Sequence, residues 1–183
     1  FHLTGNGITS RPMGLRDGNP IFTVDFDFVR HQLVASTLDG ATMSFPLQGN
    51  SVASFYLRLQ SALDALGVDG GIPSASPFDL PDADRPFAQD HEHATYVPEQ
   101  ANRYWRVLSQ VNMVLEEFSA GFSGKTSPVH HFWHTFDIAV TRFSPRRVRQ
   151  PKEAGQVVRE AYSREVVSFG FWFGDDTIPE PCF

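Results

Sequence analysis

Apolar and polar residues alternate regularly in the first part of the chain. From Phe22 to Phe28 every second residue is apolar and the residues between are polar, which is the pattern of a strand with one buried face. Two further strand-like runs, 33–38 and 41–45, are separated by Asp39-Gly40. This pair tolerates the positive φ angles of a two-residue turn, so the pattern predicts a β-hairpin.

Apolar residues then recur at helical spacing in two longer segments. Ser51 can cap a first helix, and Gly67 is placed to end it. Pro98 suits the first turn of a second, longer helix, whose apolar face continues up to Gly121. Residues 70–90 contain four prolines and are interpreted as a short strand followed by a long loop.

The last third of the chain adds strands rich in aromatic and β-branched residues. The runs 129–143 and 166–173 both favour strands, and residues 153–162 favour a short helix that Gly155 weakens. Together these elements predict an α+β fold with a mostly antiparallel, twisted sheet and helices packed on one face. The length of 183 residues predicts a single domain over residues 1–183. Both ends look cut, so we expect a fragment of a longer chain.

Composition narrows the classes of function. The formal net charge of −6 argues against a general nucleic-acid binder, because phosphate contacts need a basic surface. The single cysteine, Cys182, excludes an intrachain disulfide and a cysteine zinc cluster. Apolar runs are too short to span a bilayer, so the sequence predicts a soluble, cytoplasmic protein without a membrane partner. A homo-oligomer remains open.

Histidines are concentrated in two short clusters, Asp90-His91-Glu92-His93 and 130–134, with Asp137 three residues after the second. On a helix, His130 and His134 would lie one turn apart and could share a metal ion. The residues around them favour a strand, where the two side chains would be ~13 Å apart. Only one of them could then join a site with the first cluster. Buried ring donors, metal ligands and catalytic groups remain open as roles.

Arginine inside a strand is the second unusual feature. An inward-facing Arg142 needs a partner, and Glu160 and Glu165 are the nearest candidates in sequence. Alternatively, Arg142 and Arg146 bind an anionic ligand, since guanidinium groups hold carboxylate or phosphate with paired hydrogen bonds. Phosphate loops, dinucleotide-binding glycine motifs and nucleophile elbows do not occur in the sequence.

Three segments carry a resemblance to a known family. The string GKTSPVHHFWHTFDIAVTRFS over 124–144, the strings EAYS and SFGFW at 160–163 and 168–172, and the D-x-x-H-x-x-Y pattern within 87–96 are similar to those of an uncharacterised bacterial family, domain-of-unknown-function family 5996. The resemblance implies a relationship but no reaction. This chain departs from the family pattern at three positions: His131 replaces Phe, Pro145 replaces Gly and Arg164 replaces His.

The first hypothesis for function is a domain that binds a small anionic ligand in a polar pocket. The residues that match polar positions of the family and that we expect around the ligand are His93, His130, Trp133, Arg142, Arg146, Glu160 and Tyr162. The arginines would supply charge and the remaining polar side chains hydrogen bonds. Whether the protein is an enzyme stays open, and no catalytic residue is assigned.

Two alternatives belong to other classes. The first is a metal-dependent hydrolase that uses a divalent cation, with ligands drawn from His91, His93, His130, His134, Asp90 and Asp137. The second is a non-enzymatic scaffold or interaction module, suggested by 17 phenylalanines in 183 residues. That reading places six of them on one buried face of the sheet: Phe22, Phe26, Phe28, Phe169, Phe171 and Phe173.

Overall fold

The structure is a computed structural model that describes residues 1–14, 18–69, 76–77 and 83–183. Its contacts divide the chain into two compact units, which we call the N-terminal unit (Thr4–Trp105) and the C-terminal unit (Phe1–Leu3 with Arg106–Phe183). The single domain over residues 1–183 stays a prediction, and most of the strand and loop expected at 70–90 lies outside the described residues.

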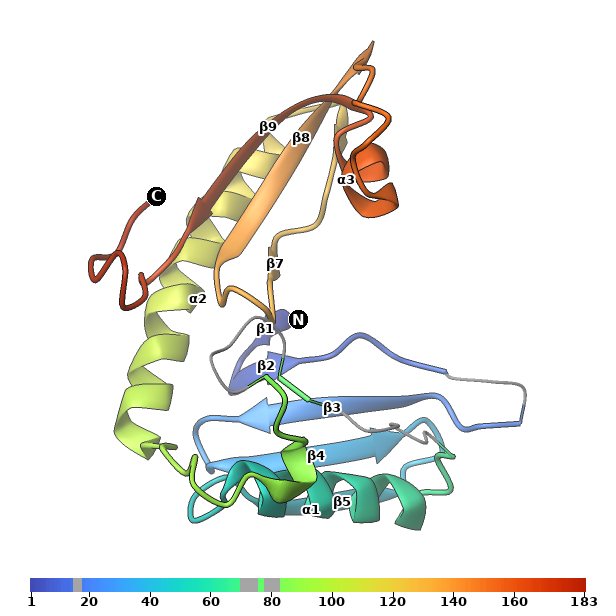
Figure 1. The fold of residues 1–183 in the computed structure, drawn as a ribbon, viewed down its shortest axis with the longest axis vertical. Coiled ribbons are helices and arrows are strands. Elements are labelled where there is room, and N and C mark those ends of the chain that lie inside the picture. The colour runs from blue at the N-terminus through green and yellow to red at the C-terminus, as the bar shows by residue number, and fades with distance from the viewer. Residues whose placement is uncertain (15–17, 70–75, 78–82) are drawn as a thin grey trace. The chain divides into compact units, whose positions relative to one another are not determined.

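An antiparallel sheet forms the framework of the N-terminal unit (Figure 1). Its strands follow the order β1-β2-β3-β4-β5, with bounds His2–Thr4, Gly7–Thr9, Phe22–Asp27, Gln32–Thr37 and Thr42–Pro46. Of β1, only Thr4 belongs to this unit. The predicted alternation holds in the first half of β3, where Phe22 and Val24 are buried, and breaks at Asp27, which is buried as well. Phe26 pairs with Leu33 and Leu33 with Phe45, so these side chains share one face of the sheet.

Helix α1 (Val52–Ala65) covers that face. Its Phe55 ring stacks on Phe26 at 6.2 Å and meets Phe45 edge-on at 5.5 Å. The predicted ends of the helix are confirmed, because the Ser51 side chain accepts a hydrogen bond from the Ser54 backbone and Gly67 adopts φ +71°. A short 3₁₀ helix, η1 (Phe87–Gln89), packs beside α1.

The predicted hairpin between β4 and β5 is present, but its turn differs from the expectation. Thr37 donates its backbone N–H to the Ala41 carbonyl at 2.9 Å, which leaves a three-residue loop instead of a two-residue turn. Gly40 occupies its last position with φ +91°. Three-residue loops of this kind place glycine where the backbone is left-handed.

The C-terminal unit contains the second sheet. Strand β8 (Ile138–Arg147) lies at its centre and pairs antiparallel with β6 (Lys125–Thr126), β7 (His130–His131) and β9 (Arg164–Phe171). Helix α2 (Pro98–Ala120) begins at the predicted proline, and its C-terminal half packs on this sheet through Phe118 and Phe169. The short helix α3 (Gln156–Ala161) precedes β9, as Figure 1 shows.

The α+β class and the antiparallel sheets are confirmed, but three details are corrected. The strands form two sheets instead of one. The run 129–143 is a hairpin, β7 and β8, whose strands are joined by a turn at 133–135. The six phenylalanines expected on one buried face divide between the two sheets; Phe22 and Phe28 are buried, whereas Phe169 is 47% exposed. In the described part of the chain, no helix has the length and apolar character that crossing a bilayer requires.

Candidate functional site

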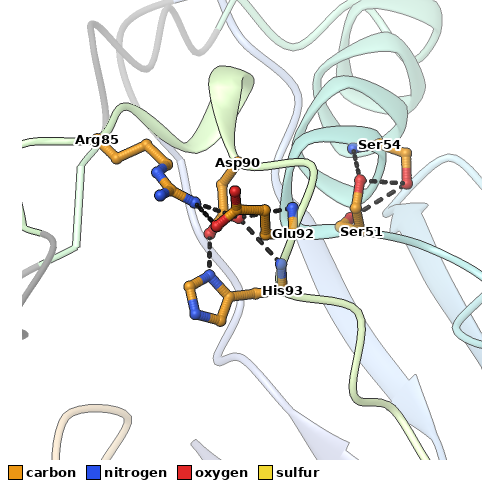
Figure 2. Close-up of polar contacts among 6 residues, drawn as sticks. All are labelled: Ser51, Ser54, Arg85, Asp90, Glu92 and His93. Carbon is orange, nitrogen blue, oxygen red and sulfur yellow. Dashed lines mark hydrogen bonds and ion pairs between the residues drawn. The ribbon is translucent and has the colours of Figure 1, made fainter.

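A polar cluster in the N-terminal unit is centred on Asp90, directly after η1 (Figure 2). Asp90 is buried, and its Oδ1 accepts hydrogen bonds from the backbone N–H groups of Glu92 and His93 at 3.2 and 3.1 Å. Its Oδ2 lies 2.8 Å from Nδ1 of His93. The His93 side chain is 55% exposed, so a buried carboxylate holds an imidazole that reaches the surface.

The protonation of this pair follows from its contacts. The backbone N–H of His93 is the main cause that lowers the pKa of Asp90; burial opposes it, and the His93 ring contributes further lowering. An ionised carboxylate only accepts hydrogen bonds, so Nδ1 of His93 carries the hydrogen. In the neutral ring the lone pair then lies on Nε2, so Nε2 is the ring atom that can accept a proton.

Backbone hydrogen bonds to helix α1 hold residues 90–93 in place. The carbonyls of Asp90 and His93 accept the N–H groups of Ala53 and Val52 at 2.8 and 2.9 Å, in the first turn of α1. The backbone N–H of Ser54 donates to the Ser51 side-chain hydroxyl at 3.2 Å. The segment therefore caps the helix. These N–H groups are already bound, so they are not a ready site for an anion.

Arg85 and Glu92 complete the cluster. Nη1 of Arg85 lies 3.5 Å from Oδ1 of Asp90 and 2.9 Å from Oε2 of Glu92. One arginine is thus shared by two carboxylates, and Glu92 is 76% exposed. The cluster is consequently not cationic, in a unit whose sequence has twelve acidic and six basic residues.

A second imidazole, that of His31, contacts Tyr96, three residues after His93. The Tyr96 hydroxyl is 3.0 Å from Nδ1 of His31, which occupies the turn between β3 and β4 with φ +56°. Burial, and to a smaller degree the charge of Asp27, raise the pKa of Tyr96 to about 12. The phenol is therefore neutral, and a neutral phenol can either donate to Nδ1 of His31 or accept from it.

Asp27 is a structural residue that the sequence pattern assigned to the polar face of β3. It is buried instead, and it accepts hydrogen bonds from the backbone N–H groups of Val29 and Arg30 at 2.9 and 2.7 Å and from Nδ2 of Asn6 at 2.9 Å. Burial acts to raise the pKa of Asp27, but these bonds outweigh it and lower the pKa. Asp27 thus fixes the turn that carries His31.

Sequence reasoning named two residues of the polar cluster as candidate site residues, Asp90 and His93, and missed the other two, Arg85 and Glu92. It also missed the contact between His31 and Tyr96. The D-x-x-H-x-x-Y pattern contained the signal for Tyr96, because its last position is the residue that contacts His31. No local signal pointed to His31, since its contact spans 65 positions.

The other predicted ligand-binding residues belong to the C-terminal unit, where the structure gives them mainly local contacts. Arg142 donates to the Phe118 carbonyl and lies 3.4 Å above the Phe118 ring, so its partner is neither Glu160 nor Glu165. Nη1 of Arg146 pairs with Glu165 at 3.1 Å. His130 is half-buried, and its Nδ1 contacts the Pro128 carbonyl at 2.9 Å. The remaining three predicted residues are exposed: Trp133, Glu160 and Tyr162.

The predicted metal ligands divide in the same way. Asp90, His91 and His93 lie in the N-terminal unit, and the others, His130, His134 and Asp137, lie in the C-terminal unit. Asp90 and His93 contact each other, whereas His91 is exposed. Among the described residues, no three His, Cys, Asp or Glu side chains converge to hold a metal ion.

Comparison with known proteins gives one match. A family model described as a family of unknown function, DUF5996, matches residues 1–183. No curated protein and no solved structure matches the chain. The match covers the whole chain and carries no reaction, ligand or partner with it.

Proposed function

The chain belongs to the family of unknown function DUF5996, and since that family brings no reaction with it, we propose a function from the site: general acid–base catalysis on a small polar ligand, with His93 as the base. The observation that carries the proposal is the 2.8 Å contact between buried Asp90 and exposed His93. Asp90 is the positioning residue. It holds the ring in the tautomer whose Nε2 lone pair accepts a proton.

The charges around the ring favour a neutral ligand over an anionic one. Arg85 is the basic side chain paired within this cluster, and Asp90 and Glu92 already share it. An anion approaching His93 would meet two carboxylates at close range, and like charges repel. A neutral ester, amide or water molecule carries no such cost. Proton abstraction or water activation is therefore the class of reaction that we propose.

Hydrolysis of p-nitrophenyl acetate by the full chain tests this proposal. Replacing His93→Asn keeps an N–H donor toward Asp90 and removes Nε2, so we expect the rate above buffer background to fall roughly 10²-fold. Asp90→Asn should also lower it, because an amide no longer selects the required tautomer. The rate is followed by absorbance of the released nitrophenolate.

His91→Asn is the matched control, because His91 is an exposed histidine two residues away. We expect it to leave the rate unchanged. Equal losses in the His91 and His93 variants would show that both act as ordinary surface imidazoles and would contradict the proposal.

A second candidate function, binding of a small anion at Arg85, is favoured by the exposure of Glu92. An ion pair with a partner that is 76% exposed is weak, and a ligand carboxylate can take the place of Glu92. Glu92→Gln removes this competitor, and we expect it to tighten citrate binding about fivefold, corresponding to ~1 kcal/mol of removed repulsion. Thermal shift over a citrate titration measures the effect.

Two further variants complete the citrate experiment. Arg85→Gln should abolish the stabilisation by citrate, and Glu99→Gln, which removes an exposed charge from the first turn of α2, should leave it unchanged. Equal citrate affinity in the Glu92→Gln variant and the parent would exclude Arg85 as the anion site.

A further inference from the structure

Residues 132–136 connect β7 and β8 in the C-terminal unit, and we call them the aromatic turn. Several hydrogen bonds stabilise this turn. The backbone N–H of Phe132 donates to the Asp137 carbonyl at 2.8 Å, and that of Phe136 donates to the Phe132 carbonyl at 3.0 Å. The Thr135 hydroxyl also donates to the Asp137 side chain. These bonds hold the turn in one conformation.

This rigid turn presents three large rings to solvent. Phe132 is 42% exposed, Trp133 66% and Phe136 57%. Single exposed apolar residues are common on protein surfaces, but three within five residues form an apolar patch of the kind that marks binding sites. A five-residue turn is much smaller than the ~20–30 residues that each side contributes to a standard protein–protein interface. Its size suits a small ligand.

The backbone of Phe136 is the second, independent observation. Its φ of +57° lies in the left-handed region, which is strained for a bulky side chain and is the usual place of glycine or asparagine. The Phe136 ring meets that of buried His131 edge-on at 5.6 Å, so the ring is fixed in place. Residues held in strained backbone conformations cluster at binding sites.

The rings are also oriented by their neighbours. His134 meets Trp133 edge-on, with centroids 5.9 Å apart and an interplanar angle of 86°. The His130 ring lies 4.4 Å from that of Phe132. Side chains braced in this way lose little conformational freedom when a ligand binds. Flat faces of aromatic rings bind other planar rings by offset stacking.

We propose that the aromatic turn is a binding site for a planar heteroaromatic ring of a small ligand, with Trp133 as the principal stacking surface. Stacking and not ion pairing supplies the attraction, because residues 132–136 include no Asp, Glu, Lys or Arg. The site lies in the C-terminal unit and is independent of the function proposed for His93.

Adenosine is a suitable probe, and ribose is its matched control without the planar ring. The chain has three tryptophans, so its ¹H–¹⁵N spectrum contains three indole N–H signals, and Trp133→Phe identifies the one that matters. We expect adenosine to shift the Trp133 signal in a saturable manner and ribose to leave it in place. Shifts of equal size with both compounds, or none with adenosine, would overturn the proposal.

Phe136→Gly separates binding from a structural role. Glycine relieves the left-handed backbone but removes the ring that meets buried His131 edge-on at 5.6 Å, so we expect the melting temperature to change little while adenosine binding weakens at least severalfold. A fall in melting temperature with unchanged adenosine binding would show that the ring serves folding. Broadening of the Trp133 signal with protein concentration alone would show that a second copy covers the turn, and would also overturn the proposal.

Discussion

Replacing Gly7 by alanine is expected to destabilise the N-terminal unit by about 3 kcal/mol or more. A Cβ at this position would lie 1.7 Å from the carbonyl oxygen of Phe26 and 2.9 Å from its carbonyl carbon. Both atoms are backbone of the neighbouring strand, so they cannot rotate away as a flexible side chain would. Strand β2 must move, and its pairing with β3 is lost or distorted. Urea titration of the purified chain measures the change in the free energy of unfolding.

Gly5→Ala is the matched control, because a Cβ there has no atom within 4 Å. We expect it to change the free energy of unfolding by less than about 0.5 kcal/mol. Similar costs at the two glycines would show that β2 does not approach β3 as closely as described. Gly7 pairs with Asp27, and its neighbour Asn6 donates to that carboxylate. The close approach that glycine permits therefore also fixes the turn carrying His31.

Helix ends were predictable because their signals are local. Ser51 accepts the N–H of Ser54 three residues later, and Gly67 follows the end of α1 with positive φ. Pro98 begins α2, as expected for a residue without a backbone N–H. Each signal depends on residues within one turn of the helix, so a single sequence contains all the information needed.

The turn between β7 and β8 could not be predicted for the opposite reason. Turns are recognised by glycine, proline, asparagine and aspartate, and this one places Phe136 in the left-handed region. Aromatic residues at 132, 133 and 136 extend the strand pattern of their surroundings. The hydrogen bonds that hold the turn override that preference.

Partners of charged and polar side chains were predicted only when they were close in sequence. Asp90 and His93 are three positions apart and belong to one cluster in the sequence. Arg142 instead donates to a main-chain carbonyl, which every residue possesses and no sequence pattern marks. His31 and Tyr96 meet only because the sheet and α1 bring their segments together. The candidate site was therefore half predictable, through its local pair.

Replacing His131 by phenylalanine is expected to remove a large part of the acid sensitivity of the fold. His131 is 1% exposed, and its pKa is lowered to about 4, mainly by burial and further by the positive charge of the nearby N-terminal amine of Phe1. The unfolded side chain titrates near 6.5. Between these two pKa values, His131 is protonated in the unfolded chain and neutral in the folded chain. The free energy of unfolding therefore decreases as the pH falls from about 6.5 toward 4. Full loss amounts to about 3 kcal/mol, at ~1.4 kcal/mol for each unit of pKa.

Phenylalanine suits this position for packing as well, since His131 meets the Phe136 ring edge-on at 5.6 Å, an arrangement that two phenylalanines also favour. It is also the residue that the family pattern places here. Urea titrations of both proteins at pH 7.5, 6.0 and 4.5 compare their free energies of unfolding. Exposed carboxylates titrate alike in both proteins, so the difference between their free energies of unfolding reports the contribution of His131 alone. This difference should increase by about 2–3 kcal/mol between pH 7.5 and 4.5. Parallel curves would mean that His131 takes up its proton within the folded protein and that this strand opens to solvent.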